Sequence, residues 1–445
     1  MAGTIETEMD FTKEPVPQNR RMPRFGLTMA WWAVCSAMFW IIVAATLASA
    51  YGTRNAIIGL LLTVLAYSAV NAFITRFAIR TGLSVSLFSR ILFGRTGSMI
   101  ATLIFAATAI YYAVFEGSVI AVAATYVWPG LSYNLAAFLV VLISVPLVFG
   151  SVQNWLDKFN GVLLPIYLIG LATAVVLAIS TYGYNGDWPS LPGSAPSSTG
   201  WRDVFVAYMG VWILMMFTFD YARFGKVEDE DYHARINFGG PFYIVTILVA
   251  GLAGIFITDT IPVEGALSEV SAVKAIIAMM GLFGMLFVWV TQTRINTANY
   301  YLAAVNLEAF GRLALRLDLS KIVWAIVVGA IVFGLMLFDV FAYLLTALAY
   351  QGVFVVAWVG VALAYMMKFG TQHANSAGRT DDQAYPAYNV SGLMAWFAAV
   401  ILGIVAMHIP DLARFSAPLT AVASFAFYCI AGRPVSVAAA TASPR

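Results

Sequence analysis

Residues 289–301 read WVTQTRINTANYY and lie inside a long apolar run that extends from Ile276 to Ala303. A helix that crosses the hydrocarbon core of a membrane needs about 20 mostly apolar residues, and the run is long enough. Its hydroxyl, amide and guanidinium groups cannot face lipid, because nothing in the hydrocarbon would satisfy their hydrogen bonds. The stretch therefore predicts a helix in a membrane protein, with a polar face that lines a cavity or bonds to polar neighbours.

The composition of the whole chain favours the same class of protein. Of the 445 residues, 61% are hydrophobic and only 10% are charged, and the mean hydropathy is +0.85. A soluble fold of this size needs a more charged surface, so the solvent for most of the chain must be lipid. The net charge of +2 gives no basic tract for nucleic acid, and two cysteines, Cys35 and Cys429, make neither a disulfide framework nor a metal site. Enzyme signatures such as HExxH, GxSxG and GxGxxG are missing, so we expect neither an enzyme nor a cofactor.

Hydropathy divides the chain into apolar runs separated by polar breaks. We count twelve candidate spans, which predict an all-α membrane protein with twelve transmembrane helices. They cover roughly Leu27–Ala50, Ala56–Ile74, Ser98–Val127, Leu135–Phe149, Val162–Ser180, Val204–Phe219, Phe242–Ile257, Ile276–Ala303, Ile322–Phe338, Ala342–Met367, Leu393–His408 and Pro418–Ala431.

The distribution of basic residues predicts the orientation. With the polar tail of residues 1–24 inside, 19 of the 24 basic residues fall in inside segments, Arg294 lies within a span, and only Arg54, Arg202, Lys274 and Arg414 fall outside. This asymmetry favours cytoplasmic termini and a multi-pass protein of the plasma (inner) membrane. The outside segment Thr181–Gly200 and the inside segment Thr371–Tyr388 are predicted to be loops.

Two ionisable residues stand inside the spans, where they are costly and indicate a substrate or ion pathway. Glu116 follows Tyr112 by one helical turn in IYYAVFEGS, residues 110–118, so a ring and a carboxyl share one face. The alternative is a protonated Glu116 bonded to a backbone carbonyl. Arg294 is the second such residue.

Trp212 is a candidate for ring stacking, although packing is the more common role of a buried tryptophan. Twelve dissimilar spans with single buried ionisable residues favour a carrier over a pore, which would need repeated filters or rings of charge.

Four stretches, in order along the chain, resemble the nucleobase–cation symporter family of the purine–cytosine permease and hydantoin transporter type. The most specific is TGLSVSLFSRILFGRTGS, residues 81–98, followed by the link Gly150–Pro165. The third is DYARF, residues 220–224, in which Ala222 replaces the usual hydroxyl residue, and the fourth is NTANYY, residues 296–301.

The resemblance implies a LeuT-like fold with two inverted repeats of five helices and two accessory helices. The expected divisions are an inside tail of residues 1–24, a first repeat over 25–182, a second over 201–367, accessory helices over 389–432 and an inside tail over 433–445. The family breaks helices 1 and 6 at the midplane, where such folds bind substrate. The breaks are expected near Cys35–Ala37 and near Gly210–Val211.

The resemblance also implies a substrate site. Tyr112 and Glu116 correspond to the family's stacking and polar positions in helix 3, Trp212 or Val211 to the stacking position in helix 6, and Asn299, with Asn296 nearby, to the amide position in helix 8. A flat heteroaromatic ring would lie between Tyr112 and Trp212, and its edge would meet Glu116 and Asn299. A carboxylate accepts from two adjacent donors, which favours a donor-rich purine or a cytosine-like base. The small-molecule substrate and the lipid bilayer are the only partners we expect.

The cation site departs from the family pattern. Sodium-coupled members use hydroxyl residues on helix 8 and carbonyls of helix 1, in the region of Ser36, Ala37, Thr293 and Arg294. Thr293 keeps a hydroxyl, but a guanidinium has five donors and no acceptor, so Arg294 cannot ligate Na⁺. We therefore expect sodium-independent transport, either facilitated or coupled to H⁺ through Glu116. An ion pair between Arg294 and Glu116 would instead hold the carboxyl ionised.

Other interpretations stay open at the level of sequence. Asp220 and Arg223 are expected to form a structural or gating ion pair. A LeuT-like carrier of amino acids or amines, a sodium-coupled hydantoin or vitamin carrier, and a channel or membrane sensor are the alternative functions.

Overall fold

The computed structural model is a bundle of helices. It describes residues 11, 14–149, 156–195, 197–261, 269–338, 344–378 and 385–434, and within them the only β-type pairing is an isolated bridge between Met22 and Gly225. The prediction of an all-α protein is confirmed. The α-helices are α1 (Arg24–Trp31), α2 (Met38–Tyr51), α3 (Thr53–Thr81), α4 (Val85–Val127), α5 (Tyr133–Leu147), α6 (Asp157–Tyr182), α7 (Gly200–Met209), α8 (Ile213–Ala222), α9 (Glu230–Tyr232), α10 (Gly240–Tyr243), α11 (Ala250–Thr260), α12 (Glu269–Met280), α13 (Leu282–Phe310), α14 (Lys321–Met336), α15 (Leu344–Gly378), α16 (Val390–Met407), α17 (Pro410–Ala413) and α18 (Ser416–Ala431).

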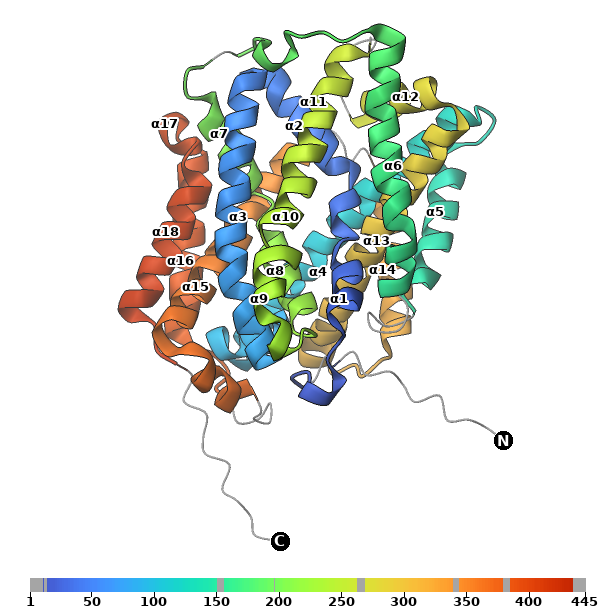
Figure 1. Cartoon of the computed structure of the whole chain (residues 1–445). Helices are drawn as coiled ribbons and strands as arrows, with labels where there is room; N and C mark the ends of the chain where they lie inside the picture. The colour runs from blue at the N-terminus through green and yellow to red at the C-terminus, as the bar shows by residue number, and fades with distance from the viewer. Residues whose placement is uncertain are drawn as a thin grey trace, which may run out of the picture.

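The lengths and composition of these helices are those of a membrane protein. Among the described residues, six helical segments are long and apolar enough to cross a membrane, and the number rises to eight when two bent helix pairs each count as one span. Three shorter apolar helices, α5, α14 and α18, accompany them. Most helices run roughly along one direction, and the described segment before α1 lies at the same end of the bundle as the C-terminal end of α18, an end that we call the terminal side (Figure 1).

Two helices are broken where the sequence predicted breaks. The first consists of α1 and a 3-10 turn η2 (Val34–Ser36), followed by α2 at an angle of 40°. Its break falls at Ala37, whose ψ of 131° leaves the helical region. The second break separates α7 from α8 by 42°. Both breaks lie deep inside the protein, because Ala37, Gly210 and Val211 are all buried.

Three of the differences between the helix boundaries and the predicted spans involve a glycine. The link before Ser98 is helical, and α4 begins at Val85 with a kink at Gly94, whose φ is 82°. The predicted span that starts at Ile276 is two helices, because Gly281 adopts φ 59° between α12 and α13. The segment from Thr371 was predicted to be a loop, but α15 continues to Gly378 beyond a kink at Gly370 with φ 68°. Hydropathy reports which residues suit lipid and not the backbone angles of a glycine, so it misses helix in polar stretches and breaks at a glycine.

The polar stretch of residues 289–301 lies in the middle of the bundle. Helix α13 packs along α4, and η2 also contacts α13. Helices α15, α16 and α18 pack together beside this centre, on the left in Figure 1. Residues 1–10, 12, 13 and 435–445 of the predicted tails, and the part of the family-like link over 150–155, lie outside the described residues.

Candidate functional site

A small cavity lies between the two helix breaks and the central helices α4 and α13. Its volume is about 20 Å³, which is room for one water molecule and not for a heterocyclic ring. The cavity brings together five of the residues singled out in the sequence: Ala37, Tyr112, Glu116, Val211 and Asn299. The remaining lining is apolar and consists of Val34, Phe39, Trp40, Ile213, Leu214, Phe217 and Ile295.

Glu116 is 1% exposed and is held by one side chain of α13. The Nε2 atom of Gln292 donates to the Glu116 carboxylate and also lies 3.4 Å from the Glu116 backbone oxygen. The other end of Gln292 accepts from the backbone N–H of Met38 at 3.0 Å. Met38 is the first residue of α2, so this N–H is one that the helix itself cannot satisfy. Gln292 therefore connects the carboxylate on α4 to the break in the first span.

The cavity is aromatic on the side of α2. The ring of Phe39 meets Tyr112 edge to face, with a distance of 5.7 Å between centroids. The Tyr112 hydroxyl accepts a hydrogen bond from Gln351 Nε2 at 3.1 Å. Trp40 lines the cavity and donates from Nε1 to the carbonyl of Val34 at 2.9 Å. Sequence reasoning missed Gln292, Phe39 and Trp40, although Gln292 lies in the polar run and both rings directly follow the predicted break.

Of the candidate residues on the second broken helix and on α13, some line the cavity and others lie beside it. Val211 lines the cavity, whereas Trp212 is buried beside it and is not among the lining residues. Asn299 lines the cavity, and its Nδ2 donates to Asn296 Oδ1 at 3.2 Å. Asn296 Nδ2 in turn lies 3.5 Å from the carbonyl of Ala113 on α4. Asn299 thus faces the cavity, and Asn296 supports it from behind.

Arg294 is fully buried at the end of α1, away from Glu116. Its Nη2 donates to the carbonyl of Trp32 at 2.8 Å, and the guanidinium lies 5.9 Å from the centroid of the Tyr167 ring. Its Nε and Nη1 atoms have no hydrogen-bond partner among the described residues. Trp32 is the C-cap of α1, and a helix C-terminus carries partial negative charge, which favours a cation there. The described residues show no ion pair between Arg294 and Glu116.

The other residues of the predicted cation region do not all lie next to Arg294 at the end of α1. The single hydrogen of the Ser36 hydroxyl is shared between the carbonyls of Ala33 at 2.8 Å and Thr291 at 3.1 Å, which ties η2 to α13. Thr293 instead lines a separate apolar groove between α4, α5 and α13. Consecutive residues on a helix point about 100° apart, so Thr293 and Arg294 serve different surfaces. Among the described residues, no group of three His, Cys, Asp or Glu side chains could hold a metal ion.

Asp220 and Arg223 lie at the terminal-side end of α8. Asp220 Oδ1 accepts from the backbone N–H of Val85 at 2.9 Å. Arg223 Nε donates to the Asp220 backbone carbonyl at 3.1 Å, and Nη1 donates to the carbonyl of Phe11 at 2.7 Å. These contacts connect α8 with the start of α4 and with the N-terminal segment, and both residues follow Phe217, the last residue of α8 that lines the cavity.

Comparisons with known proteins identify the family of the chain. The sequence profile of a family described as permeases for cytosine/purines, uracil, thiamine and allantoin matches residues 15–430. No curated protein sequence gives a significant match.

Solved structures show the fold. Mhp1, a nucleobase-cation-symport-1 family transporter in a closed conformation with bromovinylhydantoin bound, has 17% identity and a TM-score of 0.76, with 94% of each chain covered. Mhp1 in an inward-facing conformation has 16% identity and a TM-score of 0.74, with 95% of this chain and 93% of that one covered. A Na⁺-coupled sialic acid symporter has 12% identity and a TM-score of 0.65, with 96% and 93% covered. The LeuT-like fold and the family resemblance read from the sequence are therefore confirmed. Because the family profile spans nearly the whole sequence, the chain belongs to the family of permeases for cytosine and purines, uracil, thiamine and allantoin.

Proposed function

We propose that this permease imports a nucleobase or a related flat heterocycle across the plasma membrane by alternating access, and binds it in the cavity between the two helix breaks. The observation that carries the proposal is the position of Glu116. A buried carboxylate, oriented by Gln292, faces a cavity walled by aromatic rings. Such a site offers a flat donor-rich ring both stacking and charged hydrogen bonds.

The aromatic rings that line the cavity are not the pair Tyr112 and Trp212 that the resemblance implied. Tyr112 stays the stacking residue of α4, and the support for a partner ring is strongest for Phe39 and Trp40, which line the cavity together with Val211. Trp212 would have to rotate inward when the cavity opens. Asn299 supplies an amide donor and an acceptor for the ring edge.

The architecture that goes with this function has twelve membrane spans. Eight are supported by length and composition with the bent pairs joined, and three more are the shorter apolar helices α5, α14 and α18. The twelfth is α13, whose polar residues lower its hydropathy although its 29 residues extend about 43 Å. Residues 25–182 and 201–367 would form the inverted repeats, and residues 389–432 the accessory pair. The excess of basic residues in the inside segments supports cytoplasmic termini.

Transport is proposed to be independent of sodium. The guanidinium of Arg294, held on the carbonyl of Trp32 at the C-terminus of α1, would act as a permanent cation there. Sodium would lack both space and an acceptor on this side chain. Glu116 has no cationic partner among the described residues, which keeps it available to carry a proton with the substrate. The alternative to coupling with H⁺ is facilitated transport, in which Glu116 binds the substrate without carrying a proton.

Thermal stability of the purified protein tests substrate class and coupling together. A ligand that binds only the folded state raises the melting temperature. We expect purines or cytosine-like bases to raise it equally in NaCl and in choline chloride. We expect Arg294→Ala to weaken this response in both salts, whereas Arg202→Ala on the outer surface should leave it unchanged.

The alternatives give different results in the same experiment. Stabilisation that requires Na⁺ would favour a sodium-coupled hydantoin or vitamin carrier and would refute the role of Arg294. Stabilisation by amino acids or amines alone would refute the substrate class. Saturable counterflow of the stabilising ligand in proteoliposomes then separates a carrier from a sensor.

A further inference from the structure

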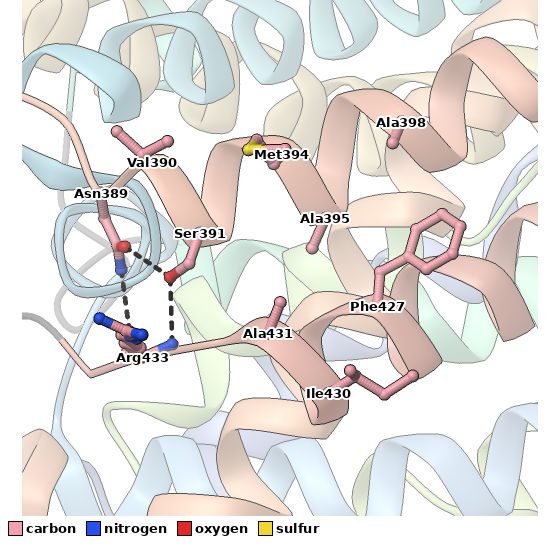
Figure 2. Close-up of a pocket in the computed structure, with 10 residues that line it drawn as sticks. All are labelled: Asn389, Val390, Ser391, Met394, Ala395, Ala398, Phe427, Ile430, Ala431 and Arg433. Atoms are coloured by element: carbon pink, nitrogen blue, oxygen red, sulfur yellow. Dashed lines mark hydrogen bonds between the residues drawn. The ribbon is translucent and has the colours of Figure 1, made fainter.

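A second, larger groove lies on the outer face of the bundle, between α16 and α18 at the terminal side. Its volume is about 660 Å³, within the range of roughly 300 to 1,000 Å³ that holds organic ligands. Figure 2 shows Met394 on α16 and Phe427 and Ile430 on α18 along the groove. Met394 is 66% exposed and Ile430 is 83% exposed, so in a membrane this wall contacts lipid chains.

One end of the groove is polar and is held in a definite geometry. The Ser391 hydroxyl donates to Asn389 Oδ1 at 2.9 Å and accepts from the backbone N–H of Arg433 at 3.0 Å. Asn389 Nδ2 donates to the backbone carbonyl of Arg433 at 3.2 Å. The side chains of Asn389, which caps the start of α16, and of Ser391 therefore fix the backbone of Arg433 at the mouth of the groove, as the dashed lines in Figure 2 show.

The charge at this end is positive. The exposed guanidinium of Arg433 makes no hydrogen bond or ion pair with the described residues, and none of the described residues that line the groove is acidic. Lys368 Nζ donates to the carbonyls of Cys429 at 3.0 Å and Gly432 at 2.9 Å, so a second cation lies at the end of α18. Basic sites between helices at the cytoplasmic side of a membrane suit anionic head groups.

The length of the groove matches one leaflet. The lining residues of α16 extend from Val390 to Ala398, a rise of about 12 Å. Half of the hydrocarbon core is about 15 Å. An acyl chain whose head group lies at Arg433 would therefore fill the groove without leaving its own leaflet.

We propose that this groove is a binding site for an anionic phospholipid of the leaflet on the terminal side. The phosphate and the charged head group pair with Arg433, and one acyl chain lies against Met394, Phe427 and Ile430. The site does not depend on the transported substrate, so its test is separate from that of the proposed function.

Native mass spectrometry of the delipidated full-length protein tests this proposal with two probes, phosphatidylglycerol and phosphatidylcholine with the same acyl chains. We expect one site that prefers phosphatidylglycerol by about five-fold, the equivalent of the ~1 kcal/mol that one basic residue contributes near an anionic surface. Arg433→Gln should abolish the preference and Arg433→Lys should retain it. Arg414→Gln, an exposed arginine near the other end of α18, is the matched control and should behave like the wild type.

A second pair of variants tests the apolar part. Ala398 is exposed and lines the groove, so Ala398→Trp should fill it and weaken the binding of both lipids. Val405→Trp adds the same ring two turns further along α16, outside the groove, and should have no effect. A lipid preference that survives Arg433→Gln overturns the proposal. So does a dimer that Ala398→Trp dissociates, because a second copy of the chain would then be the occupant.

Discussion

Gln292 contacts three parts of the site through one amide group. It donates to the carboxylate of Glu116 and to the backbone of α4, and it accepts from Met38 at the start of α2. An amide held at both ends has a defined orientation, which leaves the second carboxylate oxygen of Glu116 for another donor. At the scale of single residues, the site is thus a carboxylate positioned by an amide.

The first prediction concerns the charge of Glu116. Glu116→Gln keeps the shape of the side chain and an acceptor for Gln292, so the variant should fold with a melting temperature close to that of the wild type. Loss of a charged hydrogen bond to substrate should weaken binding by about ten-fold or more. The concentration of nucleobase that gives half of the maximal thermal shift measures this.

The control for this variant is Asp411→Asn, which removes the same charge from an exposed position in α17. It should leave nucleobase affinity unchanged. A Glu116→Gln protein with wild-type affinity and wild-type dependence of uptake on pH would exclude the carboxylate from both binding and coupling.

At the scale of elements, the broken first span is held by close contact with its neighbours. Helix α11 approaches α2 at Gly254, where a Cβ atom would lie 2.1 Å from the carbonyl oxygen of Ile41. Small residues allow such approach of helix backbones in membranes. The position of α2, and with it of Phe39 and Trp40, therefore depends on this glycine.

We predict that Gly254→Ala lowers the melting temperature by several degrees, because overpacking a tight contact costs about 1 to 3 kcal/mol. Gly334→Ala on α14 is the matched control, since no atom lies within 4 Å of its added Cβ. It should be neutral or slightly stabilising, as alanine favours helix over glycine. Equal melting temperatures for the two variants would show that α2 and α11 separate easily.

At the scale of the whole molecule, the helices leave little space at the candidate site. A cavity of about 20 Å³ would have to enlarge before a ring could enter it. The N-terminal segment lies across the terminal side. Arg21 donates to the carbonyls of Ile79 at 2.9 Å and Gly225 at 2.8 Å, and burial with the nearby charge of Arg223 lowers its pKa to about 10, so it stays charged at neutral pH.

Cys35 provides a native probe of opening. It is buried in η2 beside the break, whereas Cys429 is exposed. In a Cys429→Ser protein we predict slow reaction of Cys35 with N-ethylmaleimide in the presence of saturating nucleobase, and several-fold faster reaction without it. Reaction of Cys429 in the Cys35→Ser protein should not respond to the ligand. If no ligand changes the rate at which Cys35 reacts with N-ethylmaleimide, the result would argue against opening of the protein at this break.

Hydropathy and composition were sufficient for the class of protein, and the spacing of Tyr112 and Glu116 predicted that they share one helix face. The resemblance to the family implied both helix breaks and the roles of Val211 and Asn299, which the fold brings to one cavity with Tyr112 and Glu116. These predictions succeed because burial in lipid and a polar face on a helix depend on local sequence. Hydropathy could not reveal that α15 continues to Gly378 or that a new helix starts after Gly281, since the first stretch is polar and the second change depends on a positive φ angle at a glycine.

The sequence by itself therefore determined that the chain is a helical membrane carrier with a buried carboxylate and a buried guanidinium. Only the tertiary structure decided that Glu116 bonds to Gln292, that Arg294 bonds to Trp32 at the end of α1, and that Thr293 faces a different groove. It also decided that Asn389, Ser391 and Arg433 meet at the mouth of the outer groove. The reason is physical: these contacts join residues far apart in the chain, and helix packing, which no local pattern specifies, sets which faces meet.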